Sequence, residues 1–241
     1  DLDNRRLSAV ARDLIRARGK SLVIAGRCQP APVHALVTLL NSALGNIGRT
    51  VTFVEPVDGI MPDRVMSQRL IEQMAAGSVD TLIMLGGNPV YDMPADWKFS
   101  EALSKVKHAV HLSSHADETS LACEWHLPEA HFLESWGDVR SVDGTASIVQ
   151  PLIDPMFGGR SQIEVLSHLT TGEQKSGYEL TRETWGKVWS PLTFEHNWGQ
   201  ALNKGVVGDS ALPRLKPDVD GSTVGYLIRE SASPSAEAGP A

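Results

Sequence analysis

Apolar residues follow two alternating patterns along the first half of the chain. Short, nearly continuous apolar runs are typical of strands that are buried on both faces. They occur at Ser21–Gly26, Thr50–Glu55, Asp80–Gly86 and His108–Ser114. The segments between and before them repeat apolar residues at helical spacing and predict helices. These segments are Leu7–Ala17, Val33–Leu44, Arg64–Ala76 and Ala95–Val106. The alternation predicts an α/β fold with a doubly wound, mostly parallel sheet and helices on both faces.

The pattern changes after the fourth predicted strand. Cys123–Pro128 predicts one more short strand, and residues 129–160 are rich in Gly, Pro, Asp and aromatic residues without clear periodicity. Helical spacing returns in three segments, which are Ile163–Leu169, Tyr178–Val188 and Phe194–Lys204. The last two are rich in tryptophan, which favours an ordinary helical core. The C-terminal region has the composition of a linker.

These patterns divide the chain into three predicted parts. Residues 1–172 are expected to form the α/β domain, and residues 173–215 a C-terminal helical extension that packs on it. Residues 216–241 are expected to be an extended or disordered linker.

Composition excludes several classes of protein. The net charge of −7 and the scattered basic residues argue against nucleic-acid binding. No apolar run approaches the roughly 20 residues that span a bilayer, and no signal peptide is apparent. The first residue is not methionine, so we expect a processed product or a piece of a longer protein. The two cysteines, Cys28 and Cys123, are too few for a disulfide framework or a four-thiolate metal site.

Glycine-containing loops at the carboxyl ends of the predicted strands are the candidate ligand site. Ligands of doubly wound sheets bind at this edge. In LIMLGGNPVYDMP (residues 82–94) two glycines allow close backbone approach, and proline directs the preceding residue away from helical geometry. Polar residues of the loop after the fourth strand are the other candidates. The predicted pocket residues are Gly26, Gly86, Gly87, Asn88, Pro89, His115, Asp117, Glu118 and Thr119.

Other chemistries have weaker support in the sequence. His111 and His115 are candidates for an acid–base pair or for metal ligands, but no HExxH or HxH spacing is present. A Ser–His–Asp assembly from Ser113 or Ser114 lacks the GxSxG motif. GxGxxG and GxxxxGK[ST] are also absent, which argues against a standard dinucleotide or Walker-type site. We therefore predict no catalytic residue and no metal ligand in this chain.

Three motifs in order resemble the molybdopterin oxidoreductase superfamily, the dimethyl sulfoxide reductase group. They are LGGNPVYDMP, HADETSLACEWHLP and ESWGDVRSVDG, and the resemblance spans roughly residues 20–170. The family has GxNP, an acidic-Thr segment leading to ADxVLP, and ExxGTxxNxEGRxQ. The matching positions here are Gly87, Asn88, Pro89, Asp117, Glu118, Thr119, Leu127, Pro128, Glu134, Gly137, Asp143 and Gly144. In the family this region contributes to the site of a bis-pterin guanine dinucleotide.

Several polar positions depart from that family pattern. Asp138 stands where the family has Thr, Ser141 where it has Asn, Thr145 where it has Arg, and Cys123-Glu124 where it has Ala-Asp. Loss of the arginine removes a charge-assisted contact of about 1.5–3 kcal/mol with a phosphate-bearing ligand. An aspartate facing phosphate would add repulsion. These departures argue against tight binding of the pterin dinucleotide.

His131–Ser161, GYELTRETW and FEHNWGQALNKGVV further resemble the molybdopterin-like iron–sulfur subunit of alternative complex III. That resemblance implies a scaffold fragment of a quinol-oxidising respiratory complex, peripheral on the periplasmic face of the bacterial cytoplasmic membrane. No cofactor is expected in this chain, and iron–sulfur clusters are expected elsewhere in the parent protein. The implied partners are the iron–sulfur domain of the same parent chain, cytochrome c and the membrane quinol-oxidising subunits.

Two alternatives remain open at this stage. The first is a genuine molybdopterin guanine dinucleotide-binding domain of an active reductase or dehydrogenase. The second is a self-contained nucleotide-binding module.

Overall fold

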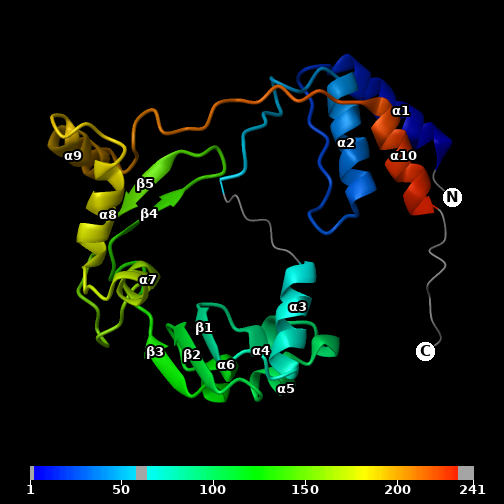
Figure 1. The fold of residues 1–241 in the computed structure, drawn as a ribbon. Helices are drawn as coiled ribbons and strands as arrows, with labels where there is room; N and C mark the ends of the chain where they lie inside the picture. The colour runs from blue at the N-terminus through cyan, green and yellow to red at the C-terminus, as the bar shows by residue number, and fades with distance from the viewer. Residues whose placement is uncertain (1–2, 58–63, 233–241) are drawn as a thin grey trace. The chain divides into compact units, whose positions relative to one another are not determined.

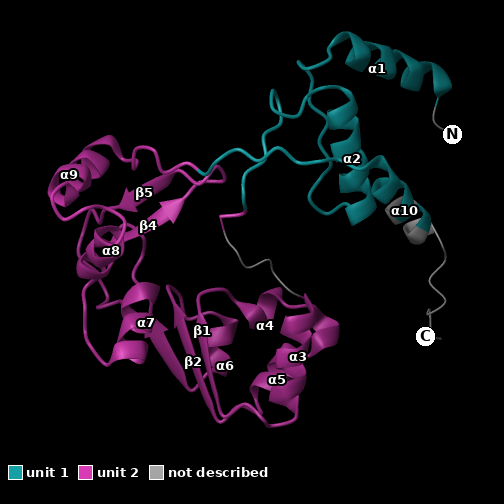
Figure 2. Ribbon diagram, turned by 45° about the horizontal axis from the view of Figure 1, so that its top comes forward, with its two compact units in different colours: residues 1–55, 212–241 teal, residues 56–211 magenta. Residues whose placement is uncertain are grey.

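The computed structural model describes residues 3–57 and 64–232 (Figure 1). The chain forms two compact units, which Figure 2 distinguishes by colour. One unit contains residues 1–55 together with 212–241, and the other contains residues 56–211. Our three-part division of the chain stays a prediction. Within the described residues, no helix has the length and apolar character needed to cross a membrane.

The larger unit is built on a three-stranded parallel sheet. Its strands are β1 (Thr81–Leu85), β2 (His108–Ser113) and β3 (Trp125–Pro128), in the order β1-β2-β3. Leu82 pairs with Ala109, and Leu112 pairs with Leu127. Helices flank the sheet (Figure 1), which confirms the predicted α/β class.

The helices around this sheet are short, apart from α3 (Arg64–Ala75). Between β1 and β2 lie α4 (Pro89–Asp92), the 3-10 turn η1 (Ala95–Trp97) and α5 (Phe99–Leu103), and α6 (Glu118–Ala122) joins β2 to β3. The helix that we predicted over Ala95–Val106 is interrupted because Lys98 adopts a left-handed conformation with φ of 50°. A buried core unites α3, α5 and the sheet. Its residues are Ile71, Met74, Phe99, Ala102, Leu103, Val106 and Ala109.

The rest of the larger unit surrounds a second core. The hairpin β4 (Gly137–Arg140) and β5 (Ala146–Val149) lies in the segment for which we predicted no regular structure. The helices α7 (Gln162–Thr171), α8 (Gly177–Gly186) and α9 (Phe194–Lys204) agree with the predicted helical segments. The buried core residues are Ala146, Ile148, Trp185, Trp198, Ala201 and Val207. The tryptophan-rich helices therefore contribute an ordinary core, as their composition predicted.

The smaller unit is helical. It contains α1 (Asn4–Arg16), α2 (Ala31–Ala43) and α10 (Gly221–Ala232), and α10 packs beside α2 (Figure 2). Helix α10 lies within residues 216–241, for which we expected an extended or disordered linker. The end of that predicted linker, residues 233–241, lies outside the described residues.

Two strand predictions in this unit are wrong. Ser21–Gly26 connects α1 to α2 without forming a strand, and Thr50–Glu55 contributes only isolated bridges. These bridges join Ile47 to Val51 and Phe53 to Leu215. A strand is defined by its pairing, and no neighbouring strand within the described residues pairs with either segment.

Candidate functional site

Two of the predicted loops meet at the carboxyl edge of the sheet. Gly86 and Gly87, after β1, have φ of 73° and 71°, in the left-handed region that favours glycine. Asp117, after β2, is the N-cap of α6, and its side chain accepts from the backbone N–H of Ser120. Because β1 and β2 are parallel, their following loops emerge on the same edge. The structure thus brings residues 86–89 and 117–119 together, and ligand binding by them stays a prediction.

Asn88 and Thr119 fasten these two loops to each other. Oδ1 of Asn88 accepts from the backbone N–H of Thr119 at 3.2 Å and from its hydroxyl at 2.7 Å. Nδ2 of Asn88 donates to Oε2 of Glu118 at 2.6 Å, which lowers the pKa of that carboxyl. The buried Thr119 hydroxyl accepts from the backbone N–H of Val90 at 3.0 Å, at the start of α4. The polar groups that match the family motif therefore bond internally.

Asn88→Ala tests this fastening. The substitution removes the acceptor of the Thr119 backbone N–H and of its buried hydroxyl, so we expect the free energy of unfolding to fall by about 2 kcal/mol. All six tryptophans lie in the larger unit, so tryptophan emission during urea unfolding measures this change. Asn203→Ala, at an exposed position of α9, should change it by less than about 0.5 kcal/mol. Equal effects of the two substitutions would contradict a fastening role.

His111 supports the first loop from the centre of the sheet. Its side chain is fully buried. Nε2 lies 3.0 Å from the carbonyl oxygen of Gly87, which can only accept, so Nε2 carries a hydrogen. Nδ1 lies 2.8 Å from Oγ of Ser120 and 3.5 Å from a carboxylate oxygen of Asp117. Each ring nitrogen therefore has an internal partner.

Ser120 extends this arrangement to the third strand. Its Oγ lies 2.9 Å from Nδ1 of His126. When Ser120 donates to Nδ1 of neutral His111, it can accept from an N–H of His126. Hydrogen bonds then run from His126 on β3, through α6 and His111, to the Gly87 carbonyl. Ser120 and His126 were not among the site residues predicted from the sequence.

Asp117 lies beside the same network. Burial raises the pKa of the Asp117 carboxyl, but the backbone N–H of Ser120, the electrostatic interaction with His111 and the hydroxyls of Ser120 and Ser113 together lower it by more. The net pKa lies below the ordinary value, so Asp117 is an anion at neutral pH. Its position places negative charge at the same edge as Glu118.

The burial of His111 and Ser120 indicates that this network has a structural role. His111 and Ser120 are shielded from solvent, so neither can reach a substrate. The hydroxyl of Ser113 contacts Asp117 at 3.5 Å rather than a histidine ring. His115 is exposed, and its Nδ1 lies 3.0 Å from Oγ of Ser114. Among the residues that the structure describes, no group of three His, Cys, Asp or Glu side chains could hold a metal ion.

Gly26 belongs to the smaller unit, so the structure describes it separately from the other predicted pocket residues. Its carbonyl accepts from the backbone N–H of Gln29 at 2.9 Å and closes a turn before α2.

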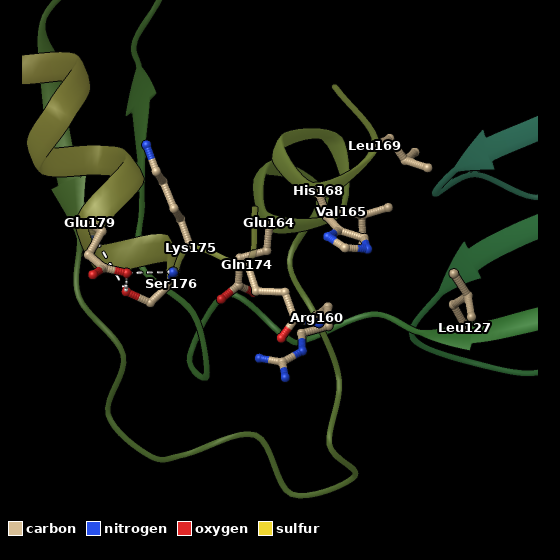
Figure 3. A pocket seen from close by; sticks show the side chains of 10 residues that line it. All are labelled: Leu127, Arg160, Glu164, Val165, His168, Leu169, Gln174, Lys175, Ser176 and Glu179. Carbon is tan, nitrogen blue, oxygen red and sulfur yellow. Dashed lines mark hydrogen bonds between the residues drawn. The ribbon is translucent and has the colours of Figure 1, made fainter. Parts of the chain in front are cut away.

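A cavity of about 520 Å³ lies beside the end of β3 (Figure 3). Leu127, Val165 and Leu169 give it apolar walls. Its other lining residues are Arg160, Glu164, His168, Gln174, Lys175, Ser176 and Glu179. None of the pocket residues predicted from the sequence lines it.

The two carboxylates of this cavity have internal partners. Glu164 accepts from the backbone N–H of Ser161 and of Gly177. Glu179 accepts from the backbone N–H and hydroxyl of Ser176, as Figure 3 shows. Each carboxylate completes a capping box at a helix start. These contacts give both glutamates a role in helix formation.

Asp138, the departure that we weighed against phosphate binding, has a partner within the protein. Its Oδ2 accepts from the indole Nε1–H of Trp185 at 2.8 Å. Trp185 belongs to the core around α8 and α9 and is nearly fully buried. The aspartate therefore ties the β4–β5 hairpin to α8.

Comparison with known proteins gives one partial similarity. No protein-family model matches the chain. The molybdopterin-binding-like subunit of menaquinone reductase from Nitratidesulfovibrio vulgaris is 25% identical over 172 residues. This match covers 64% of the present chain, which spans about a quarter of that relative's length (25%). At this coarse level the similarity agrees with a molybdopterin-related oxidoreductase.

Proposed function

We propose that this chain is a part of a respiratory oxidoreductase subunit with a molybdopterin-enzyme fold, and that it acts as a scaffold without a cofactor or catalysis of its own. The observation that carries the proposal is the mutual bonding of Asn88, Glu118 and Thr119. Side chains at positions that match the family's cofactor loop hold two loops of the protein together. The molybdopterin-binding-like relative supports the same class.

The residues at this edge do not fit a phosphate-bearing pterin dinucleotide. Asp117 and Glu118, both with lowered pKa values, match the acidic segment of the family, so their charge alone does not separate the two candidates. The backbone N–H groups of Thr119 and Ser120, which could bind an anion, already donate to Asn88 and Asp117. Thr145 supplies no positive charge where the family has arginine. The occupied backbone donors and the missing arginine therefore argue against tight binding of a dinucleotide.

Asp138 provides a second, independent argument for the scaffold role. A threonine-to-aspartate difference at a pterin site would be unfavourable, but here the carboxylate satisfies a buried tryptophan N–H. The difference is explained by packing of α8 against the hairpin. A polar position of the family motif thus serves the fold instead of a ligand.

We further propose that the parent assembly is of the alternative complex III type. Its partners would be the iron–sulfur domain of the same parent chain, cytochrome c and membrane quinol-oxidising subunits, on the periplasmic face of the membrane. The supporting observations are the resemblance of His131–Ser161 and a relative that is a subunit of a menaquinone reductase.

The second candidate is a pterin guanine dinucleotide- or nucleotide-binding domain. The cavity at the end of β3 favours it, because Arg160 and His168 line the cavity and neither side chain has a hydrogen-bond partner among the described residues. Such groups could bind an anionic or hydrogen-bonding ligand. The two candidates give opposite results with nucleotides.

A thermal-shift titration with GMP, GDP, GTP, AMP and ATP separates the candidates. We expect no change in Tm, together with no molybdenum or pterin in the purified protein. A nucleotide that binds, at a concentration of 100 times its Kd, would raise the free energy of unfolding by about 2.7 kcal/mol. The control is Arg214→Ala, which changes an exposed arginine of the other unit. The scaffold proposal would be overturned by an increase in Tm that disappears in Arg160→Ala but remains in Arg214→Ala.

A further inference from the structure

The cavity beside the end of β3 has walls that hydrogen bonds hold in place. The backbone N–H of Arg160 donates to the carbonyl of Pro128, and its carbonyl accepts from the N–H of Ala130, each at 3.0 Å. A capping box starts α7 directly after Arg160. Glu164 of that box also accepts from the backbone N–H of Gly177 at 3.0 Å, which joins α7 to the start of α8. The cavity is therefore preformed, and all of its lining residues lie within the larger unit.

Part of the cavity wall is apolar and incompletely packed. Val165 and Leu169 are four residues apart on α7, so they lie on the same face of the helix. Leu127, on β3, supplies the third apolar side chain (Figure 3). No residue of α7 is buried, and Leu169 is 54% exposed. Because burial of apolar surface is favourable, these side chains would stabilise the apolar part of a ligand.

The polar groups of the cavity that remain unpaired are mainly donors. The side chains of Arg160 and His168 have no hydrogen-bond or ion-pair partner among the described residues. A guanidinium has five N–H donors and no acceptor. The carboxylates of Glu164 and Glu179, in contrast, already accept from backbone N–H groups at the helix starts. The cavity therefore suits a ligand that brings its own acceptor.

The charge of the lining limits the charge of that ligand. Two positive side chains, Arg160 and Lys175, are balanced by two negative ones, Glu164 and Glu179, so the lining is neutral when His168 is neutral. Lys175 pairs with carboxylates outside the cavity. Arg160 is thus the unpaired cation among the described residues of the lining. One guanidinium in a neutral lining complements a single negative charge, whereas several phosphate charges would exceed it.

We propose that this cavity binds a small monocarboxylate with an apolar body. The Arg160 guanidinium would hold the carboxylate through two parallel N–H···O bonds, since its planar fork matches carboxylate geometry. His168 would donate a further hydrogen bond, and the apolar side chains would contact the rest of the ligand. The volume of about 520 Å³ lies within the range of about 300–1,000 Å³ that is usual for small-molecule sites. This inference does not depend on the proposed function, because a scaffold without a cofactor can also carry such a site.

Titration of the full chain with 4-phenylbutyrate, followed by NMR, tests the proposal. We expect saturable shifts of the backbone amide signals of Val165, His168 and Leu169 that fit one site. The alcohol 4-phenylbutanol lacks the charge and acetate lacks the apolar body, so each should bind at least about tenfold more weakly. GMP should not displace 4-phenylbutyrate.

Three results would overturn the proposal. The first is the absence of saturable shifts, which coverage of the cavity by another part of the chain would also produce. The second is equal binding of 4-phenylbutanol, which would indicate apolar contact alone. The third is displacement by GMP, which would indicate a nucleotide site.

Two variants and two controls localise the ligand. Arg160→Ala removes the guanidinium, and Leu169→Asp places a negative charge in the apolar wall, so each should weaken binding at least about tenfold. Both side chains are exposed, so we expect an unchanged Tm in each variant. Lys105→Ala and Leu192→Asp change exposed positions of the same unit outside the cavity and should leave the affinity unchanged. Equal affinities of all four variants would overturn the proposal.

Discussion

His111→Ala is expected to lower the free energy of unfolding of the larger unit by about 3 kcal/mol. The substitution empties a fully buried site in the central strand and removes the donor to the Gly87 carbonyl. It also leaves the Ser120 hydroxyl with fewer partners inside the protein. Urea unfolding followed by tryptophan emission and by circular dichroism measures the change.

His108→Ala is the matched control, because His108 lies on the same strand but its side chain is exposed and contacts the Glu124 carboxylate at the surface. We expect it to change stability by less than about 0.5 kcal/mol. A small effect of His111→Ala would mean that the buried network does not hold the loop. Loss of a ligand-binding activity without loss of stability would instead indicate a functional histidine.

Trp185→Ala is expected to cost about 4 kcal/mol in the same assay. It removes a nearly fully buried indole from the second core, a change that typically costs about 3–5 kcal/mol. It also removes the indole N–H that donates a hydrogen bond to Asp138. We expect Trp185→Ala with Asp138→Ala to cost less than the sum of the single substitutions, because each single substitution disrupts the same bond.

Trp125→Ala provides the comparison for this prediction. Trp125 lies on β3 and is 59% exposed, so its loss should cost less than about 1.5 kcal/mol. Similar costs for the two tryptophans would contradict the assignment of α8 and α9 to the core. Strictly additive costs of the Trp185 and Asp138 substitutions would show that the aspartate has another role.

Local pattern was sufficient to predict the elements whose partners lie nearby in the sequence. The strands at 81–85, 108–113 and 125–128 pair in chain order. Short apolar segments that end in Gly, Ser or Pro identified them in the sequence. Ser21–Gly26 has a similar composition, yet it forms no strand because pairing depends on a neighbour that composition does not specify. The break at Lys98 was not predictable, since a lysine rarely adopts a left-handed conformation.

The convergence of the candidate loops was predictable, but the roles of their side chains were not. Parallel strands place residues 86–89 and 117–119 at one edge by topology alone. Whether Asn88 faces a ligand or Thr119 depends on side-chain directions that no motif encodes. His111 and His126 are directly paired across β2 and β3, so their relation to Ser120 required the strand register.

The amide of Asn41 has a consequence for assembly. Its oxygen accepts from Val23 and from Asn46, and its nitrogen donates to Val23 and to Val37. Polymerisation into a fibril requires each subunit to offer two free edges, one for the preceding subunit and one for the next. Since the Asn41 side chain occupies the backbone groups of Val23, Ser21–Gly26 cannot offer two free edges and is protected from stacking of this kind.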